Sequence, residues 1–146
     1  MEVPSKTAPG PGGEDRIRTD RKGSAMGRIV HVELVATDHD RAAEFYTKVF
    51  GWQVTPAPVP EGYLLAQTGP GEGIDGAIMS SRYQQQPTIA WIEVDDLEAT
   101  LDAARGAGGS QEGEIQELPG VGRLCYLRDT EGVLIGLRQR SSASPR

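Results

Sequence analysis

The side chains best suited to acid–base chemistry lie on two short segments in which apolar and polar residues alternate. His31 and Glu33 belong to the first segment, and Glu93 belongs to the second. An imidazole can take up or release a proton near neutral pH, and two carboxyl groups in different environments can serve as acid and base. We therefore identify these three residues as the candidate catalytic groups. The alternatives are that His31 is a buried histidine bonded to a carbonyl or to Glu33, and that the carboxylates are only solvated.

The same alternation places apolar and aromatic side chains beside these groups. Successive residues of a strand point to opposite faces, so Ile89 and Trp91 share a face with Glu93. A cavity that is mainly apolar, with a few polar groups, is typical of a small-molecule site. Trp91 could stack on a planar ligand, but it could equally be a core residue or a dimer contact. The residues expected to bind a ligand are Tyr63, Met79, Ile89, Trp91, Gly136 and Arg138.

An internal repeat positions these residues around one shared cavity. The segment 31–51, HVELVATDHDRAAEFYTKVFG, aligns with the segment 89–109, IAWIEVDDLEATLDAARGAGG, at an offset of 58 residues. In both copies a strand of period two gives way to an amphipathic helix that ends in glycine. Two copies of one unit predict an α+β fold with pseudo-twofold symmetry.

The pattern predicts eight strands and two helices in the order βαβββ, twice. We expect the two modules to cover 29–83 and 87–140. The helices are expected at 39–50 and 97–107. The strands are expected at 29–36, 52–56, 62–68, 74–80, 88–94, 111–117, 122–128 and 133–139.

Local signals define the ends of the two helices. Asp38 is the expected N-cap of the first helix, and Gly51 suits the left-handed conformation after its last turn. Asp95 and Glu98 have the spacing of a capping box at the start of the second helix. The apolar period of the first helix predicts a buried stripe of Ala42, Phe45, Val49 and Phe50.

Composition limits the class of protein. The segment 28–140 is expected to form one domain between disordered tails at 1–27 and 141–146, the first of which is rich in proline and glycine. A single cysteine, Cys125, allows no internal disulfide and favours the cytoplasm. A net charge of −6 argues against nucleic acid as a partner. No stretch approaches the ~20 apolar residues of a membrane span, so no membrane partner is expected.

Three segments carry a resemblance to a known family. His31-Val32-Glu33-Leu34, followed by Phe45-Tyr46 and Phe50-Gly51-Trp52, resembles the opening motif of the vicinal oxygen chelate superfamily of glyoxalases, bleomycin-resistance proteins and dioxygenases. Residues 89–96 resemble its second-module motif, and residues 129–137 resemble its closing strand. The resemblance implies that the two βαβββ modules form a cup-shaped mixed sheet.

In metal-using members of that superfamily, four inward side chains hold a divalent ion. The resemblance assigns these positions to His31, Ile78, Ile89 and Gly136, with Met79 as the alternative to Ile78. Isoleucine and glycine side chains offer no lone pair, and one imidazole does not make a divalent-metal site. The chain therefore resembles the metal-less members, and we expect neither a metal nor another cofactor.

These observations favour a metal-independent protein that binds a small, partly aromatic molecule and forms a homodimer. One alternative is an antibiotic-sequestering resistance protein, which the acidic composition permits. Another is a lyase- or isomerase-type enzyme that uses His31 with Glu33 or Glu93 as acid and base; a metal-dependent version is less favoured. A purely structural or interaction protein is also compatible with the pattern.

Overall fold

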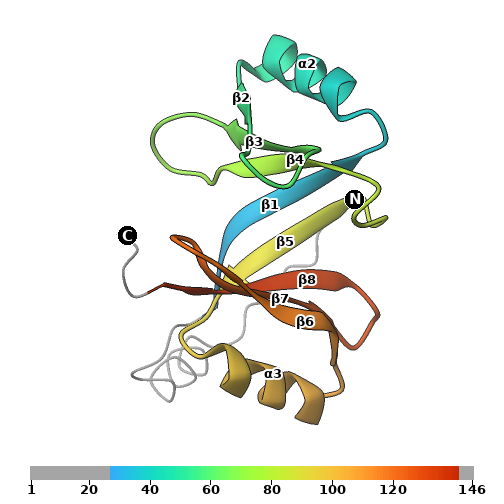
Figure 1. The fold of residues 1–146 in the computed structure, drawn as a ribbon, viewed down its shortest axis with the longest axis vertical. Coiled ribbons are helices and arrows are strands. Elements are labelled where there is room, and N and C mark those ends of the chain that lie inside the picture. The colour runs from blue at the N-terminus through green and yellow to red at the C-terminus, as the bar shows by residue number, and fades with distance from the viewer. Residues whose placement is uncertain (1–26, 142–146) are drawn as a thin grey trace, which may run out of the picture.

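A single mixed sheet of eight strands dominates the part of the chain that the structure describes, residues 27–141 of a computed structural model. The strand order is β2-β3-β4-β1-β5-β8-β7-β6, and the helices α2 and α3 lie at opposite ends of the molecule (Figure 1). The expected tails, 1–27 and 141–146, fall outside the described residues apart from Gly27 and Ser141.

Each half of the sheet comes from one βαβββ module, as the repeat predicts. The first contains β1 (Arg28–Ala36), α2 (His39–Phe50), β2 (Gln53–Pro56), β3 (Tyr63–Gln67) and β4 (Gly76–Ser80). The second contains β5 (Thr88–Glu93), α3 (Leu97–Gly106), β6 (Ser110–Leu118), β7 (Gly122–Arg128) and β8 (Leu134–Arg140). The first and last strands of each module are parallel, and the antiparallel pairing of β1 with β5 joins the modules. The predicted α+β fold class is confirmed.

The caps explain where the helices begin and end. The Asp38 carboxylate accepts a hydrogen bond from the backbone N–H of Arg41 at 3.0 Å, and Gly51 has φ 76° after the last turn of α2. The N-cap of α3 is Asp96, so the prediction of Asp95 was wrong. Asp96 accepts from the N–H of Ala99 at 3.0 Å. The repeat itself aligns Asp96 with Asp38, and this position lets the next residue, Leu97, start the helix fully buried.

The second module has a compact core between α3 and one face of the sheet. Its buried members are Leu97, Leu101, Cys125, Leu127 and Leu137. Burying a leucine side chain contributes roughly 1.5–3 kcal/mol. Cys125 behaves as the small buried apolar residue that the sequence suggests, and burial raises the pKa of its thiol.

The predicted buried stripe of α2 was wrong. Phe45, Val49 and Phe50 are 55%, 55% and 59% exposed, and no residue of α2 is fully buried. The half-buried residues of α2 include Ala42, Ala43 and Tyr46. They are small or lie beside the predicted stripe. The apolar period therefore marks a face that the sheet leaves uncovered. There the aromatic rings pack on one another, and Tyr46 stacks on Trp52 at 4.7 Å between ring centroids.

Candidate functional site

The central strands gather the candidate residues on the sheet face opposite the core of α3, which we call the cup face. Met79, Ile89, Trp91 and Leu134 form a buried cluster there, with Val35, Tyr63, Leu124 and Tyr126 packed against it. The cluster thus brings together four of the six predicted ligand-binding residues: Tyr63, Met79, Ile89 and Trp91.

A buried carboxyl group lies at the centre of this face. Glu33 is only 3% exposed. The Tyr63 hydroxyl donates a hydrogen bond to Oε2 of Glu33 at 2.7 Å, and the Tyr126 hydroxyl donates to Oε1 at 3.0 Å. Two tyrosines from different modules therefore hold one carboxyl group.

His31 extends this network by one step. Its Nε2 lies 2.9 Å from the Tyr63 hydroxyl. When Glu33 is ionised, the single proton of that hydroxyl is donated to Glu33. The His31 Nε2 then carries a proton and donates it to the tyrosine oxygen. In that state a neutral His31 has the Nε2–H tautomer, and its Nδ1 is an acceptor.

Burial controls the charge of both groups. It lowers the pKa of His31 to about 4, with a further contribution from the Arg138 cation that Asp75 partly opposes. His31 is therefore neutral near pH 7. Burial also raises the pKa of Glu33, although the hydrogen bonds from its tyrosines favour the ionised form. The pKa values of Tyr63 and Tyr126 are raised, chiefly by burial, so both remain proton donors.

The Trp91 indole lies over a residue that has no side chain, Gly136. Trp91 on β5 is paired with Gly136 on β8. A Cβ atom on Gly136 would lie 2.2–2.4 Å from three ring atoms of the indole, closer than real contacts allow. The indole therefore occupies the space that a side chain at position 136 would need. Its N–H helps to lower the pKa of Glu33 but makes no hydrogen bond of ordinary geometry.

The four positions that the resemblance assigns to a divalent metal do not fit one. Ile78 and Ile89 are fully buried apolar residues, and the indole of Trp91 covers Gly136. Only His31 offers a lone pair. Across residues 27–141, no three His, Cys, Asp or Glu side chains lie close enough together to form a metal site.

A charged group borders the network at the end of β5 and β8. Glu93 Oε2 accepts a hydrogen bond from Arg140 Nε at 2.8 Å and lies 3.9 Å from a terminal nitrogen of Arg138. Glu93, the predicted acid–base partner of Glu33, is thus engaged by arginines at this end of the site. Arg138 sits opposite Glu93 in the strand register, on the same face as Gly136.

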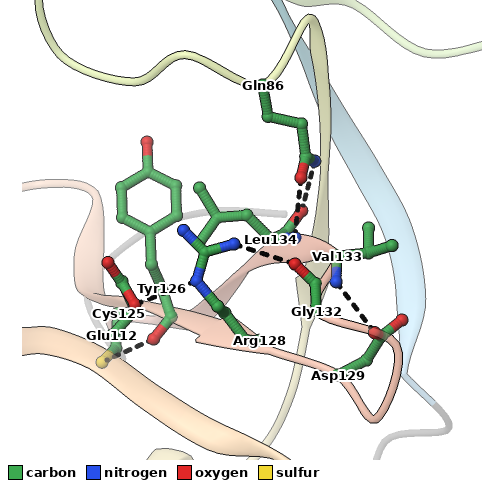
Figure 2. A network of polar contacts seen from close by, with 9 residues as sticks. All are labelled: Gln86, Glu112, Cys125, Tyr126, Arg128, Asp129, Gly132, Val133 and Leu134. Carbon is green, nitrogen blue, oxygen red and sulfur yellow. Dashed lines mark hydrogen bonds and ion pairs between the residues drawn. The ribbon is translucent and has the colours of Figure 1, made fainter.

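Tyr126 is not among the site residues predicted from the sequence. The signal that could have found it is the alternation along β7, where Cys125 belongs to the core of α3 and its neighbour must therefore face the cup. Figure 2 shows the Tyr126 ring and the Cys125 sulfur on opposite sides of β7.

Gln86 was also missed, and it fastens the edge of this face. Its side-chain amide donates to the backbone carbonyl of Leu134 at 2.8 Å and accepts from the backbone N–H of Leu134 at 2.9 Å (Figure 2). Residue 86 precedes β5 and residue 134 begins β8, so this pair holds the two strands that carry Trp91 and Gly136.

A half-open pocket of about 370 Å³ lies elsewhere, by the edge strand β2. Neither Glu33 nor any aromatic side chain lines it, so we do not place the ligand there. Its walls are Gly51, Gln53, Gln67, Gly69, Pro70 and Asp75.

Comparison with known proteins places this geometry in context. Residues 28–137 match the sequence profile of the Glyoxalase/Bleomycin resistance protein/Dioxygenase superfamily. A glyoxylase-like domain-containing protein of Didymella fabae is 35% identical over 113 residues, 73% of this chain and 88% of that protein. A probable lactoylglutathione lyase of Vibrio parahaemolyticus is 34% identical over 131 residues, 81% and 94% of the two chains. The crystal structure of methylmalonyl-CoA epimerase from Mycobacterium tuberculosis shares the fold, with a TM-score of 0.62 at 20% identity over 84% of this chain and 95% of that one.

Proposed function

Because the chain belongs to the Glyoxalase/Bleomycin resistance protein/Dioxygenase superfamily, we propose that it is a metal-independent member that binds a small, partly aromatic molecule on the cup face. The observation that carries this proposal is the indole of Trp91 lying across Gly136. At position 136, where metal-using members of the superfamily have a metal ligand, this chain thus presents the aromatic ring of Trp91. Met79, Ile89 and Tyr63 surround it, and polar groups lie beside them, as is usual in small-molecule sites.

Ligand screening tests this proposal. Trp52→Phe removes the second tryptophan, which lies in the exposed aromatic group of the first module, and leaves Trp91 as the only tryptophan. We expect at least one compound from metabolite and antibiotic sets to raise the melting temperature and change the Trp91 fluorescence. Binding of that compound should persist in Trp52→Phe and be lost in Trp91→Ala. No such compound in either set would count against the proposal.

Elemental analysis tests metal independence separately. Protein prepared without an affinity tag should contain well under one equivalent of zinc, nickel, iron or manganese. Near-stoichiometric metal that is lost in His31→Ala would overturn this part of the proposal.

A second candidate function is proton transfer on a bound substrate. The observation that favours it is the continuous chain from His31 through Tyr63 to Glu33 and Tyr126. A neutral imidazole can accept a proton, and a carboxyl group of raised pKa can donate one. We assign the acid–base roles to His31 and Glu33, and to Glu93 the role of holding the arginines at the end of the site.

Turnover assays test the second candidate. The name of the Vibrio relative suggests lactoylglutathione as the first substrate to try. Activity should be strongly reduced in both His31→Ala and Glu33→Gln, with Asp102→Asn on the outer helix α3 as the control. Turnover that survives both substitutions at the site would exclude these roles.

We also propose that the chain forms a homodimer. The support is the exposed apolar face of α2, made by Phe45, Val49 and Phe50, because large apolar side chains grouped on a surface favour association. Sedimentation should give twice the chain mass for the wild type and a smaller species for Phe45→Ser combined with Phe50→Ser. A wild type that sediments as a monomer at all concentrations would refute the proposal.

A further inference from the structure

We propose that the ligand of the cup face is a monocarboxylate with an apolar body, and that Arg138 binds its carboxylate. This inference rests on the proposed ligand-binding function and names the chemical class of the ligand.

The first observation is an unsatisfied donor. Among residues 27–141, the buried side-chain nitrogens that meet no acceptor are Trp91 Nε1 and Arg138 Nε. A buried donor without an acceptor costs about as much as a lost hydrogen bond, so native structures rarely contain one. The two donors lie on the same face of the adjacent strands β5 and β8. Trp91 pairs with Gly136, and Arg138 is the next residue of β8 on that face. The indole N–H is partly compensated by Glu33, whereas Arg138 Nε has no acceptor.

The second observation is the balance of charge around Arg138. Its ion pair with Glu93 is long, at 3.9 Å, because the same carboxylate oxygen is engaged by Arg140 Nε at 2.8 Å. Two guanidinium groups thus share one carboxylate. Burial and the neighbouring Arg140 lower the pKa of Arg138, so a bound anion would relieve an unfavourable environment for the cation.

The third observation is access. The Arg138 side chain is 23% exposed although its Nε is buried, so solvent reaches other atoms of this side chain. A guanidinium presents parallel N–H groups that match the two oxygens of a carboxylate. An anion bound there lies beside the aromatic floor at Trp91, which suits an apolar body on the same molecule.

The charges also select a single negative charge. A phosphate monoester carries close to two negative charges at pH 7. The Glu93 carboxylate lies 3.9 Å from a terminal nitrogen of Arg138, and it would repel a second negative charge on a ligand bound there. A carboxylate attached to an aromatic or aliphatic group satisfies both the charge and the apolar surroundings.

Matched ligand pairs test this inference. Benzoate, phenylacetate and 3-phenylpropionate are titrated beside their primary amides, which keep the shape and lose the charge, and binding is followed by backbone amide NMR shifts and calorimetry. We expect at least one acid to bind ten-fold or more tightly than its amide. In Arg138→Gln that preference should vanish while the affinity for the amide is unchanged. In Arg138→Lys part of it should remain.

A control variant separates local from global charge. Arg105→Gln also removes one positive charge, but Arg105 lies on α3, where it pairs with Asp102, so the preference for acids should be unchanged. Equal binding of acid and amide to the wild type, or acid binding that survives Arg138→Gln, would overturn the inference and leave the proposed function standing. If the uncharged aromatic probes, the acids and the wider screening sets all fail to bind, the proposed function fails together with the inference.

Discussion

Substitution of Gly136 by alanine should disturb the floor of the cup more than its size suggests. The added Cβ would lie 2.2 Å from Cδ2, 2.3 Å from Cε2 and 2.4 Å from Cε3 of Trp91. These are ring atoms of a side chain that is 7% exposed and packs against Tyr126 at 5.0 Å between centroids. The indole must move by about 1 Å to reach ordinary contact distance, and its neighbours allow little movement.

The expected loss of folding stability is about 3 kcal/mol, the upper part of the range for overpacking a well-packed site. The backbone is not the cause, because Gly136 is absent from the glycines with positive φ. In a Trp91→Leu background the clash is removed, and the same Gly136→Ala change should cost less than about 0.5 kcal/mol or even stabilise the strand. The coupling free energy between the two sites should therefore be at least about 2 kcal/mol.

Urea denaturation followed by circular dichroism measures all four proteins of this cycle without relying on tryptophan fluorescence. Gly106→Ala is the matched control, since Gly106 lies in α3 with nothing within 4 Å of an added Cβ, and it should stabilise the protein slightly. If Gly136→Ala costs the same in the wild-type and Trp91→Leu backgrounds, the reasoning about the indole is wrong.

Four further outcomes are expected. The pKa of Glu33 is raised in the folded state, so the folded state holds this proton to higher pH than the unfolded state, and folding stability is lost as pH rises from about 4.5. In Glu33→Gln this loss of stability should be smaller. A pH profile of urea midpoints that is the same in the variant and the wild type would contradict this expectation. His31 should titrate at about 4 by NMR, below its ordinary 6.5, and Arg138→Met should raise that pKa because it removes a nearby cation; a wild-type value near 6.5 would refute the burial of His31. As pH falls, the His31 side chain takes up its proton in the unfolded state before it does so in the folded state, so protonation favours unfolding between about pH 6.5 and pH 4. His31→Gln should therefore reduce the loss of folding stability over this range. Phe45→Ser should change the stability of the isolated chain by less than about 1 kcal/mol, since that side chain is mostly exposed; a larger loss in urea unfolding at low protein concentration would place it in the core.

Residues within one repeat unit could be interpreted from the sequence because their signals are local. The bounds of α2 follow from Asp38 and Gly51, and both caps lie where the pattern predicts. Strand alternation also assigned Trp91 and Ile89 to one face, since side chains of a strand change sides at every residue. The misplaced cap at Asp95 is an error of one residue, and the repeat held the information needed to avoid it.

The connections between modules were beyond local signals. Glu33 is held by Tyr63, 30 residues away, and by Tyr126, 93 residues away. Glu93 is engaged by Arg140, a partner that a pattern of alternation does not reveal. The exposure of Phe45 likewise depends on how α2 is rotated over the sheet, whereas its period shows only that one face of the helix is apolar.

The sequence alone determined the duplicated βαβββ unit, its strand and helix positions and the face on which most candidate side chains lie, because these depend on periodicity and on neighbours a few residues apart. Ile78 is the exception, since it pairs with Leu34 on the face opposite Met79. The tertiary structure decided which of those side chains meet. Only the pairing of β1 with β5 and of β5 with β8 brings His31, Glu33 and Trp91 together, seats the indole on Gly136 and leaves Arg138 Nε without an acceptor. Contacts between residues far apart in the chain form only when strands from both modules share one sheet, and no local pattern records them.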